Sequence, residues 1–270
     1  LSLEFHGERT PGEILNEAIW SRPGVILRLG TAWSIANVRS IDERSLYFRI
    51  GCEKYKEQGA KDEAGDFVSE VHPVAPHTHV ILDWDLEVCA IAPNSELGDK
   101  RALPSRLKKL LNESETAKTG GYVFDVRPID NPEEFVRWIG SASRVTRYEM
   151  TFCGPNFFDV NEDFQKPLQR MAENIKGNDN KVVFQNQKGL EPDGLVSLSR
   201  AVIAAGNVVS AKCQTHPDGK LEKRSSKGNP ATVEVETLED PPHWKTAVDF
   251  LRSGYRDIRY GEEHNGGEAD

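Results

Sequence analysis

The chain has 270 residues, of which 37% are hydrophobic and 29% charged, and its formal net charge is -9. This length suits one large domain or two ordinary ones, and the composition is that of a folded chain rather than a disordered one. The acidic balance excludes a protein that binds nucleic acid over its whole surface, but it is compatible with one local basic face.

Cysteine spacing and hydropathy indicate a reducing environment without a membrane segment. The four cysteines are widely spaced and form no CxxC pair, which argues against a zinc knuckle or a redox dithiol (Cys52, Cys89, Cys153 and Cys213). No stretch approaches 18 uninterrupted apolar residues, and charged residues near the beginning of the chain differ from a secretory signal. We therefore expect a cytoplasmic protein.

Residues 1–118 predict a mostly antiparallel β domain, because β-branched residues and short turns dominate the stretch from 25 to 92. The expected elements are a helix at 11–20, strands at 25–29, 32–38 and 45–51, an exposed charged loop at 53–66, an extended stretch at 67–74, a hairpin of 77–83 with 86–92, and a helix at 104–111. A Lys-Thr-Gly-Gly segment at 118–121 is typical of a hinge, so we place the domain boundary there.

Residues 119–262 predict an α+β domain, split-βαβ-like, with an antiparallel sheet and its helices on one face. The expected strands are 122–126, 145–152, 181–185, 207–213, 221–226 and 231–237, and the expected helices follow the Asn-Pro-Glu-Glu cap at 131–134 and cover 161–176, 193–205 and 244–260. The acidic, glycine-rich tail at 263–270 is expected to fray.

One pattern would suit a metal site. His77 and His79 alternate on a predicted strand and so share one face, and Asp83 continues that face. Imidazole and carboxylate groups can ligate a divalent transition metal such as zinc, manganese or iron. Polar residues on the solvent face of a half-exposed sheet would give the same pattern, and an acid near position 83 also suits a turn.

Other chemistry-bearing motifs are absent or ambiguous. No phosphate-binding loop, dinucleotide fingerprint or GxSxG elbow occurs. Phe157 and Phe158 follow a Gly-Pro-Asn turn, where they could either join a core or stack on a nucleic-acid base.

The strongest functional feature is a basic hairpin centred on a Pro-Asp-Gly turn, with five Lys or Arg in the 16 residues 212–227. Lysine and arginine on such a β-ribbon can neutralise phosphates, although ordinary surface lysines at a hairpin tip would look alike. The candidate nucleic-acid-binding residues are Lys212, His216, Lys220, Lys223, Arg224 and Lys227. Further basic residues could extend the surface (Arg101, Arg106, Lys108 and Lys109; Arg137, Arg144 and Arg147).

The layout of residues 64–240 resembles bacterial phage-exclusion proteins of the Rex A type and related abortive-infection proteins. The residues that carry the resemblance are the strand return Val88–Ala92, the turn Gly154-Pro155-Asn156, the turn Asp218-Gly219 and the pair Ser225-Ser226. The resemblance implies a two-domain cytoplasmic protein with a defence or signalling role that binds DNA as a dimer without enzymatic chemistry. It transfers no catalytic residue.

The leading hypothesis is therefore a cytoplasmic α+β protein, oligomeric, that contacts nucleic acid through the basic hairpin and catalyses nothing itself. A second hypothesis is a metal-dependent hydrolase or nuclease built on His77, His79 and Asp83. A third is a protein-interaction subunit whose acidic surface docks a partner protein.

Overall fold

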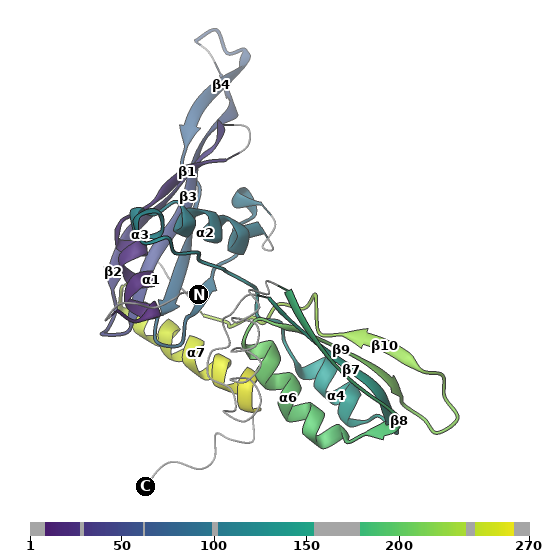
Figure 1. Cartoon of the computed structure of the whole chain (residues 1–270). Coiled ribbons are helices and arrows are strands. Elements are labelled where there is room, and N and C mark those ends of the chain that lie inside the picture. Colours follow the sequence, from purple (N-terminus) through teal and green to yellow (C-terminus); the bar gives the residue numbers. More distant parts are fainter. Residues whose placement is uncertain are drawn as a thin grey trace. The chain divides into compact units, whose positions relative to one another are not determined.

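The computed structural model describes residues 9–27, 30–61, 63–98, 102–153, 179–235 and 241–261, which form two compact units (Figure 1). The N-terminal unit comprises Phe5–Val126 and Val235–Asp249, and the C-terminal unit comprises Arg127–Glu234 and Phe250–Asp270. The two units thus divide between Val126 and Arg127, a few residues after the boundary expected from the sequence.

The N-terminal unit is an antiparallel, curled six-stranded sheet with short helices. Its elements are α1 (Pro11–Trp20), β1 (Gly24–Ile26), β2 (Ala32–Ser40), β3 (Ser45–Lys61), β4 (Phe67–Val74), β5 (His77–Asp83), β6 (Val88–Ile91), η2 (Ser95–Leu97), α2 (Ala102–Asn112) and α3 (Glu115–Gly120). The strands follow the order β1-β2-β3-β5-β6, with β4 paired to β3, and every pair is antiparallel. The predicted antiparallel β architecture is confirmed.

The helix α1 forms where the sequence predicts it, because its first turn is capped. The Thr10 hydroxyl accepts a hydrogen bond from the Glu13 backbone N–H at 3.2 Å, and the Glu13 carboxylate accepts one from the Thr10 N–H at 2.7 Å. Such a reciprocal pair satisfies two otherwise unpaired donors. The buried face of the helix (Ile14, Ala18 and Ile19) then joins the core of the unit.

The predicted loop at 53–66 is wrong, because β3 continues to Lys61 and pairs with β4 from Lys54↔Val74 to Lys61↔Phe67. The charged side chains misled the prediction: they are exposed, as a loop would be, but backbone pairing does not depend on side-chain burial. The result is a two-stranded ribbon that extends beyond the rest of the sheet of this unit (Figure 1). We call residues 54–61 and 67–74 the ribbon.

Two other local predictions of the sequence are wrong. The segment 118–121 is the last turn of α3, with Gly121 in the left-handed conformation at φ 66° as its C-cap, rather than a hinge. Residues 122–126 have no strand partner, because the Asn112 side chain binds both the N–H of Phe124 at 3.0 Å and its carbonyl at 2.7 Å. The side chain thereby replaces a neighbouring strand.

The C-terminal unit contains a four-stranded antiparallel sheet of order β10-β9-β7-β8. Its elements are α4 (Glu133–Gly140), β7 (Arg144–Cys153), β8 (Asp179–Leu190), α6 (Pro192–Ala204), β9 (Val208–Gln214) and β10 (Glu222–Ser225), and the helix α7 (Pro241–Tyr260) begins in the N-terminal unit and ends in this one. Strands β8 and β9 flank β7, both antiparallel to it, and α6 connects them. This is the split βαβ arrangement that the sequence predicted.

The strand predicted at 231–237 is wrong for the described residues 231–235, where only the isolated bridge Asp130↔Pro230 precedes a stretch without ladder pairing. The predicted helix at 161–176, the Gly154-Pro155-Asn156 turn, Phe157 and Phe158, and the tail at 263–270 lie outside the described residues. None of the helices in the described ranges has the length and hydropathy that a membrane span requires.

The core of the C-terminal unit lies on one face of its sheet, where α4 and α6 pack. Side chains that alternate along β7 and β9 join side chains of the two helices (Phe135, Trp138, Ile139, Val145, Tyr148, Met150, Leu195, Val202, Ile203, Val209, Ala211 and Cys213). Because successive strand residues point to opposite faces, the intervening side chains lie on the other side of the sheet, which we call the open face.

Candidate nucleic-acid interface

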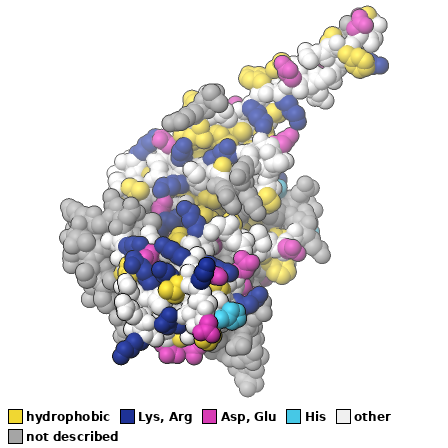
Figure 2. All heavy atoms as spheres, turned by 90° about the vertical axis from the view of Figure 1, so that its right-hand side faces the viewer, with side chains coloured by type: hydrophobic (Ala, Val, Ile, Leu, Met, Phe, Trp, Pro, Cys, Tyr) yellow, Lys and Arg dark blue, Asp and Glu magenta, His cyan; other side chains and the backbone are white. Residues whose placement is uncertain are grey.

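The open face carries a row of polar and basic side chains across all four strands. The register pairs Gln185 of β8 with Arg147 of β7, Arg147 with Lys212 of β9, and Lys212 with Lys223 of β10. We call these four residues the basic rung. Figure 2 shows Lys and Arg side chains gathered, with a few acidic ones between them, on the side of the C-terminal unit that faces the viewer.

A β-bulge in β7 completes the rung. The register shifts between Val145 and Arg147, so that Val145 is fully buried in the core while Arg147, two residues later, lies on the open face. In a regular strand these two residues would share a face. The Thr146 hydroxyl at the bulge donates to the Lys212 carbonyl at 3.1 Å, which fixes the bulge against β9.

One buried carboxylate lies close to three of the basic side chains of the open face. Glu149, whose side chain is 7% exposed, accepts hydrogen bonds from the Lys181 ammonium at 2.6 Å and from Arg147 Nε at 2.5 Å. The Lys223 ammonium lies 3.8 Å from the same carboxylate, and the Ser210 hydroxyl donates to it at 3.4 Å. The Glu149 carboxylate thus holds the Arg147, Lys181 and Lys223 side chains close to one another.

The surrounding cations also set the ionisation of Glu149. The hydrogen bond from Lys181 is the largest cause that lowers its pKa from 4.5 to about 2, and Arg147 and Lys223 lower it further against the opposing effect of burial. Glu149 is therefore charged at neutral pH and offsets one positive charge only. Arg147, Lys181, Lys212 and Lys223 together leave the open face with an excess of positive charge, on a chain that is acidic overall.

The structure divides the six predicted binding residues between different surfaces. Lys212 and Lys223 lie on the open face, because they are opposite partners in the register. Arg224, the next residue of β10, points to the opposite face: its guanidinium is 3.3 Å from the Glu222 carboxylate and lies 5.1 Å from the centre of the Trp138 ring. Strand alternation therefore separates residues that the sequence places side by side.

The remaining predicted residues lie outside the strands. His216 and Lys220 belong to the turn between β9 and β10, which the Gln214 amide closes by donating to the carbonyls of Pro217 at 2.6 Å and Gly219 at 2.8 Å. Lys227 follows the end of β10. None of these three residues therefore belongs to the basic rung.

Sequence reasoning missed three members of the open face: Lys181, Gln185 and the central Glu149. Lys181 and Gln185 are separated by the apolar run Val182-Val183-Phe184, so the sequence has no polar alternation here that would indicate a solvent face, and nothing in it shows which strand will be the neighbour. Arg147 was considered only as a flanking basic residue. Of the other basic residues considered, Lys108 pairs with Asp125 at 2.5 Å and Arg106 lies over Trp33, both in the N-terminal unit.

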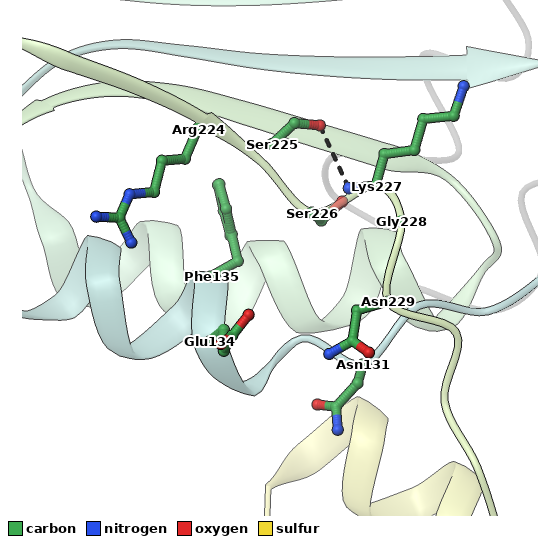
Figure 3. Close-up of a pocket in the computed structure, with 9 residues that line it drawn as sticks. All are labelled: Asn131, Glu134, Phe135, Arg224, Ser225, Ser226, Lys227, Gly228 and Asn229. Carbon is green, nitrogen blue, oxygen red and sulfur yellow. Dashed lines mark hydrogen bonds between the residues drawn. The ribbon is translucent and has the colours of Figure 1, made fainter.

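A pocket of about 260 Å³ lies on the other side of β10, between the end of that strand and the start of α4. Figure 3 shows the Arg224 and Lys227 side chains pointing in opposite directions, so their charges do not converge in the pocket. Its lining residues are Asn131, Glu134, Phe135, Arg224, Ser225, Ser226, Lys227, Gly228 and Asn229. The mixture of a carboxylate with diverging cations makes it a weaker anion site than the open face.

The residues of the predicted metal site lie on one strand but have other partners. Asp83 is buried, and its carboxylate accepts hydrogen bonds from the N–H groups of Asp85 and Leu86, both at 3.0 Å, which closes the β5–β6 turn. The Tyr47 hydroxyl is 2.9 Å from His79 Nδ1, and Arg49 is 3.1 Å from His77 Nε2. Across the described ranges, no three His, Cys, Asp or Glu side chains lie together as a metal site requires.

No protein-family model and no curated protein sequence matches the chain. The class of protein is therefore defined by fold and surface: an α+β protein of two antiparallel sheets, the second of which has helices on one face and a basic opposite face.

Proposed function

We propose that this protein binds nucleic acid through the open face of its C-terminal sheet. The observation that carries the proposal is the basic rung, in which Arg147, Lys212 and Lys223 follow one another on adjacent strands. Neighbouring strands are about 4.8 Å apart, so the three cations of the rung, on three adjacent strands, span roughly 10 Å. Cations distributed over such a length suit an extended polyanion better than a small anion, which needs convergent donors.

The chemistry of the open face favours contacts to the phosphate backbone. Its described side chains are cationic, hydroxyl, amide and aliphatic apart from the central carboxylate of Glu149, and none of those in the basic rung is aromatic. Stacking on bases needs aromatic side chains, whereas lysine and arginine bind phosphates independently of sequence. We expect binding that depends steeply on salt and weakly on nucleotide sequence.

The acidic charge of the rest of the chain supports binding that is confined to the open face. A net charge of -9 repels nucleic acid from most of the surface, so contact is concentrated where the cations gather. Glu149 contributes differently: it holds Arg147 and Lys181 in position while leaving an excess of positive charge outward.

Fluorescence anisotropy with labelled single-stranded and duplex oligonucleotides tests the proposal. Lys212→Gln combined with Lys223→Gln should weaken binding by about 10-fold or more at low salt. If each lysine neutralises one phosphate, the pair should also reduce the slope of log K against log salt by about 1.4 for single strands or about 1.8 for duplex.

The matched control is Arg137→Gln combined with Arg224→Gln. It removes two positive charges from the same unit, but Arg224 points to the opposite face and Arg137 is an exposed residue of α4, which packs on that opposite face. We expect a change of less than about 3-fold, since the net charge alone has only a weak, long-range effect. Equal losses for the two double variants would mean that the open face is not the binding surface.

A cytoplasmic defence role against phage, with DNA as the nucleic acid, extends this proposal through the resemblance to phage-exclusion proteins. The motivating residues are Val88–Ala92, Asp218-Gly219 and Ser225-Ser226. Phage plating efficiency on cells expressing the parent and the Lys212→Gln, Lys223→Gln variant tests it: protection lost with binding supports the role, and protection by neither protein contradicts it.

A further inference from the structure

The ribbon of the N-terminal unit exposes an apolar face that has no role in the nucleic-acid proposal. Register pairs place Tyr55 opposite Pro73, Glu57 opposite Val71 and Lys61 opposite Phe67, with all of these side chains on one face. Three of them are unusually exposed: 85% for Phe67, 78% for Tyr55 and 58% for Val71.

Such a face is unusual for two isolated strands. A two-stranded hairpin is at best marginally stable in water, and several large apolar side chains exposed on one face of it favour burial against another surface. Figure 2 shows the ribbon projecting, with hydrophobic, acidic and basic side chains along it. The ribbon is therefore a candidate docking surface, and its charges indicate what covers it.

Nucleic acid is a poor partner for the ribbon. Acidic residues outnumber the three lysines between 53 and 70 (Glu53, Glu57, Asp62, Glu63, Asp66 and Glu70). Two of those lysines are also engaged within the unit: Lys54 donates to the Glu96 carbonyl at 2.8 Å, and Lys56 lies 3.1 Å from the Glu96 carboxylate. A polyanion would be repelled, so a protein surface fits better.

We propose that the ribbon packs face to face against the ribbon of a second copy of this chain, with the strands antiparallel. Glu57 and Lys61 lie on the apolar face, two residues on either side of Gly59. A two-fold axis that crosses the strands at the Gly59–Ser69 pair places each Glu57 opposite Lys61 of the second copy. The same axis places each Val71 opposite Phe67 of the second copy.

The small residues at the axis allow the two faces to approach. Gly59 has no side chain, and a Cβ built there would meet nothing within 4 Å of its own chain. Apolar pairs and reciprocal ion pairs then lie on both sides of this central pair, which is the self-complementary pattern of a two-fold interface. A two-fold axis parallel to the strands would instead place Glu57 against Val71 and Lys61 against Phe67 of the second copy. Neither Glu57 nor Lys61 would then face a side chain of opposite charge.

The ribbon is short, which sets the expected affinity. Eight residue pairs at about 3.3 Å each give a contact roughly 26 Å long and two strands wide, smaller than the standard interface of about 1,600 Å². We expect a weak dimer that forms and dissociates with concentration, not an obligate one.

Sedimentation velocity of the full chain over a range of roughly 1 to 300 µM tests the proposal, since weak interfaces dissociate within that range. The parent should shift from monomer to dimer. Glu57→Lys should weaken the dimer by about 10-fold or more, because symmetry places like charges together at two positions. Glu57→Lys combined with Lys61→Glu exchanges the charges and should recover most of the affinity, apart from the contact of Lys61 with the Phe67 ring.

Two more variants make the result decisive. Phe67→Ser should weaken the dimer without lowering the thermal stability of the monomer, because Phe67 is exposed. Glu70→Lys is the matched control: it reverses a charge on the opposite face of the same ribbon and should leave dimerisation unchanged. A parent that stays monomeric throughout, or a dimer that Glu57→Lys and Phe67→Ser do not weaken, would overturn the proposal.

Discussion

Lys212 and Lys223 lie directly opposite each other on β9 and β10, with both side chains on the open face. Like charges in this position destabilise a sheet, and the Glu149 carboxylate, 3.8 Å from Lys223, offsets only part of the repulsion. The binding of a polyanion that we propose would relieve this repulsion.

Replacing Lys212 should therefore separate stability from binding. We expect Lys212→Thr to raise the free energy of unfolding by about 0.2–1 kcal/mol, because a β-branched residue replaces one of two like charges. The same change should weaken oligonucleotide binding. Urea denaturation and anisotropy measure the two effects, and a variant that is less stable than the parent would show that the pair is not repulsive.

Glu149→Gln should strengthen binding. Arg147 and Lys181 bind different oxygens of the Glu149 carboxylate, so the single amide oxygen of glutamine can accept only one of these two hydrogen bonds, and the negative charge at the centre of the open face is removed. We expect affinity for an oligonucleotide to rise by roughly 3- to 10-fold at low salt.

The control for that change is Glu222→Gln, which removes one negative charge from β10 on the side where Arg224 points. Glu222→Gln should raise the affinity for the oligonucleotide much less than Glu149→Gln does. A Glu149→Gln variant that binds no more tightly than the parent would show that the open face does not contact the ligand.

Acid should destabilise the C-terminal unit through Glu149. Its pKa is lowered from 4.5 to about 2 by the hydrogen bond from Lys181 and by Arg147 and Lys223. A depressed carboxyl pKa contributes stability that is present above pH 4.5 and is lost as the pH falls toward 2. Denaturation curves across this range should show a steeper loss for the parent than for Glu149→Gln, and parallel losses would contradict the assignment.

Tyr148 and Ser199 are joined by a buried hydrogen bond, and removing either hydroxyl should lower the free energy of unfolding by a different amount. Ser199 donates to the Leu195 carbonyl at 2.6 Å, so Tyr148, 2.9 Å away, is the donor to Ser199. Tyr148→Phe removes that donor and should cost about 1 kcal/mol. Ser199→Ala leaves the buried tyrosine hydroxyl without its acceptor and should cost about 1–3 kcal/mol. Chemical denaturation measures both, and a larger loss for Tyr148→Phe would contradict this direction of donation.

Burial also raises the pKa of the Tyr148 hydroxyl. The tyrosine therefore stays neutral, and the two truncations can be compared at any pH near neutrality without a change in its charge.

Local chemistry in the sequence was sufficient to predict several elements. The Thr10–Glu13 capping box begins α1, and the Pro-Asp-Gly turn joins β9 to β10 as expected. The antiparallel first sheet and the split βαβ of the second were also predictable, because hydrophobic periodicity and turn residues act over short distances. The ribbon was not, since its exposed, charged strands have the composition of a loop.

The sequence by itself determined that a mostly antiparallel β half is followed by an antiparallel α+β half and that a local basic segment lies at 212–227. Only the tertiary structure decided which charged residues of the C-terminal unit lie together. Strand alternation turned Arg224 away from Lys223, a bulge moved Arg147 onto the open face, and strand order brought Lys181 to Glu149. The physical reason is that charges interact through space, and their distances depend on register and strand neighbours that one sequence does not specify.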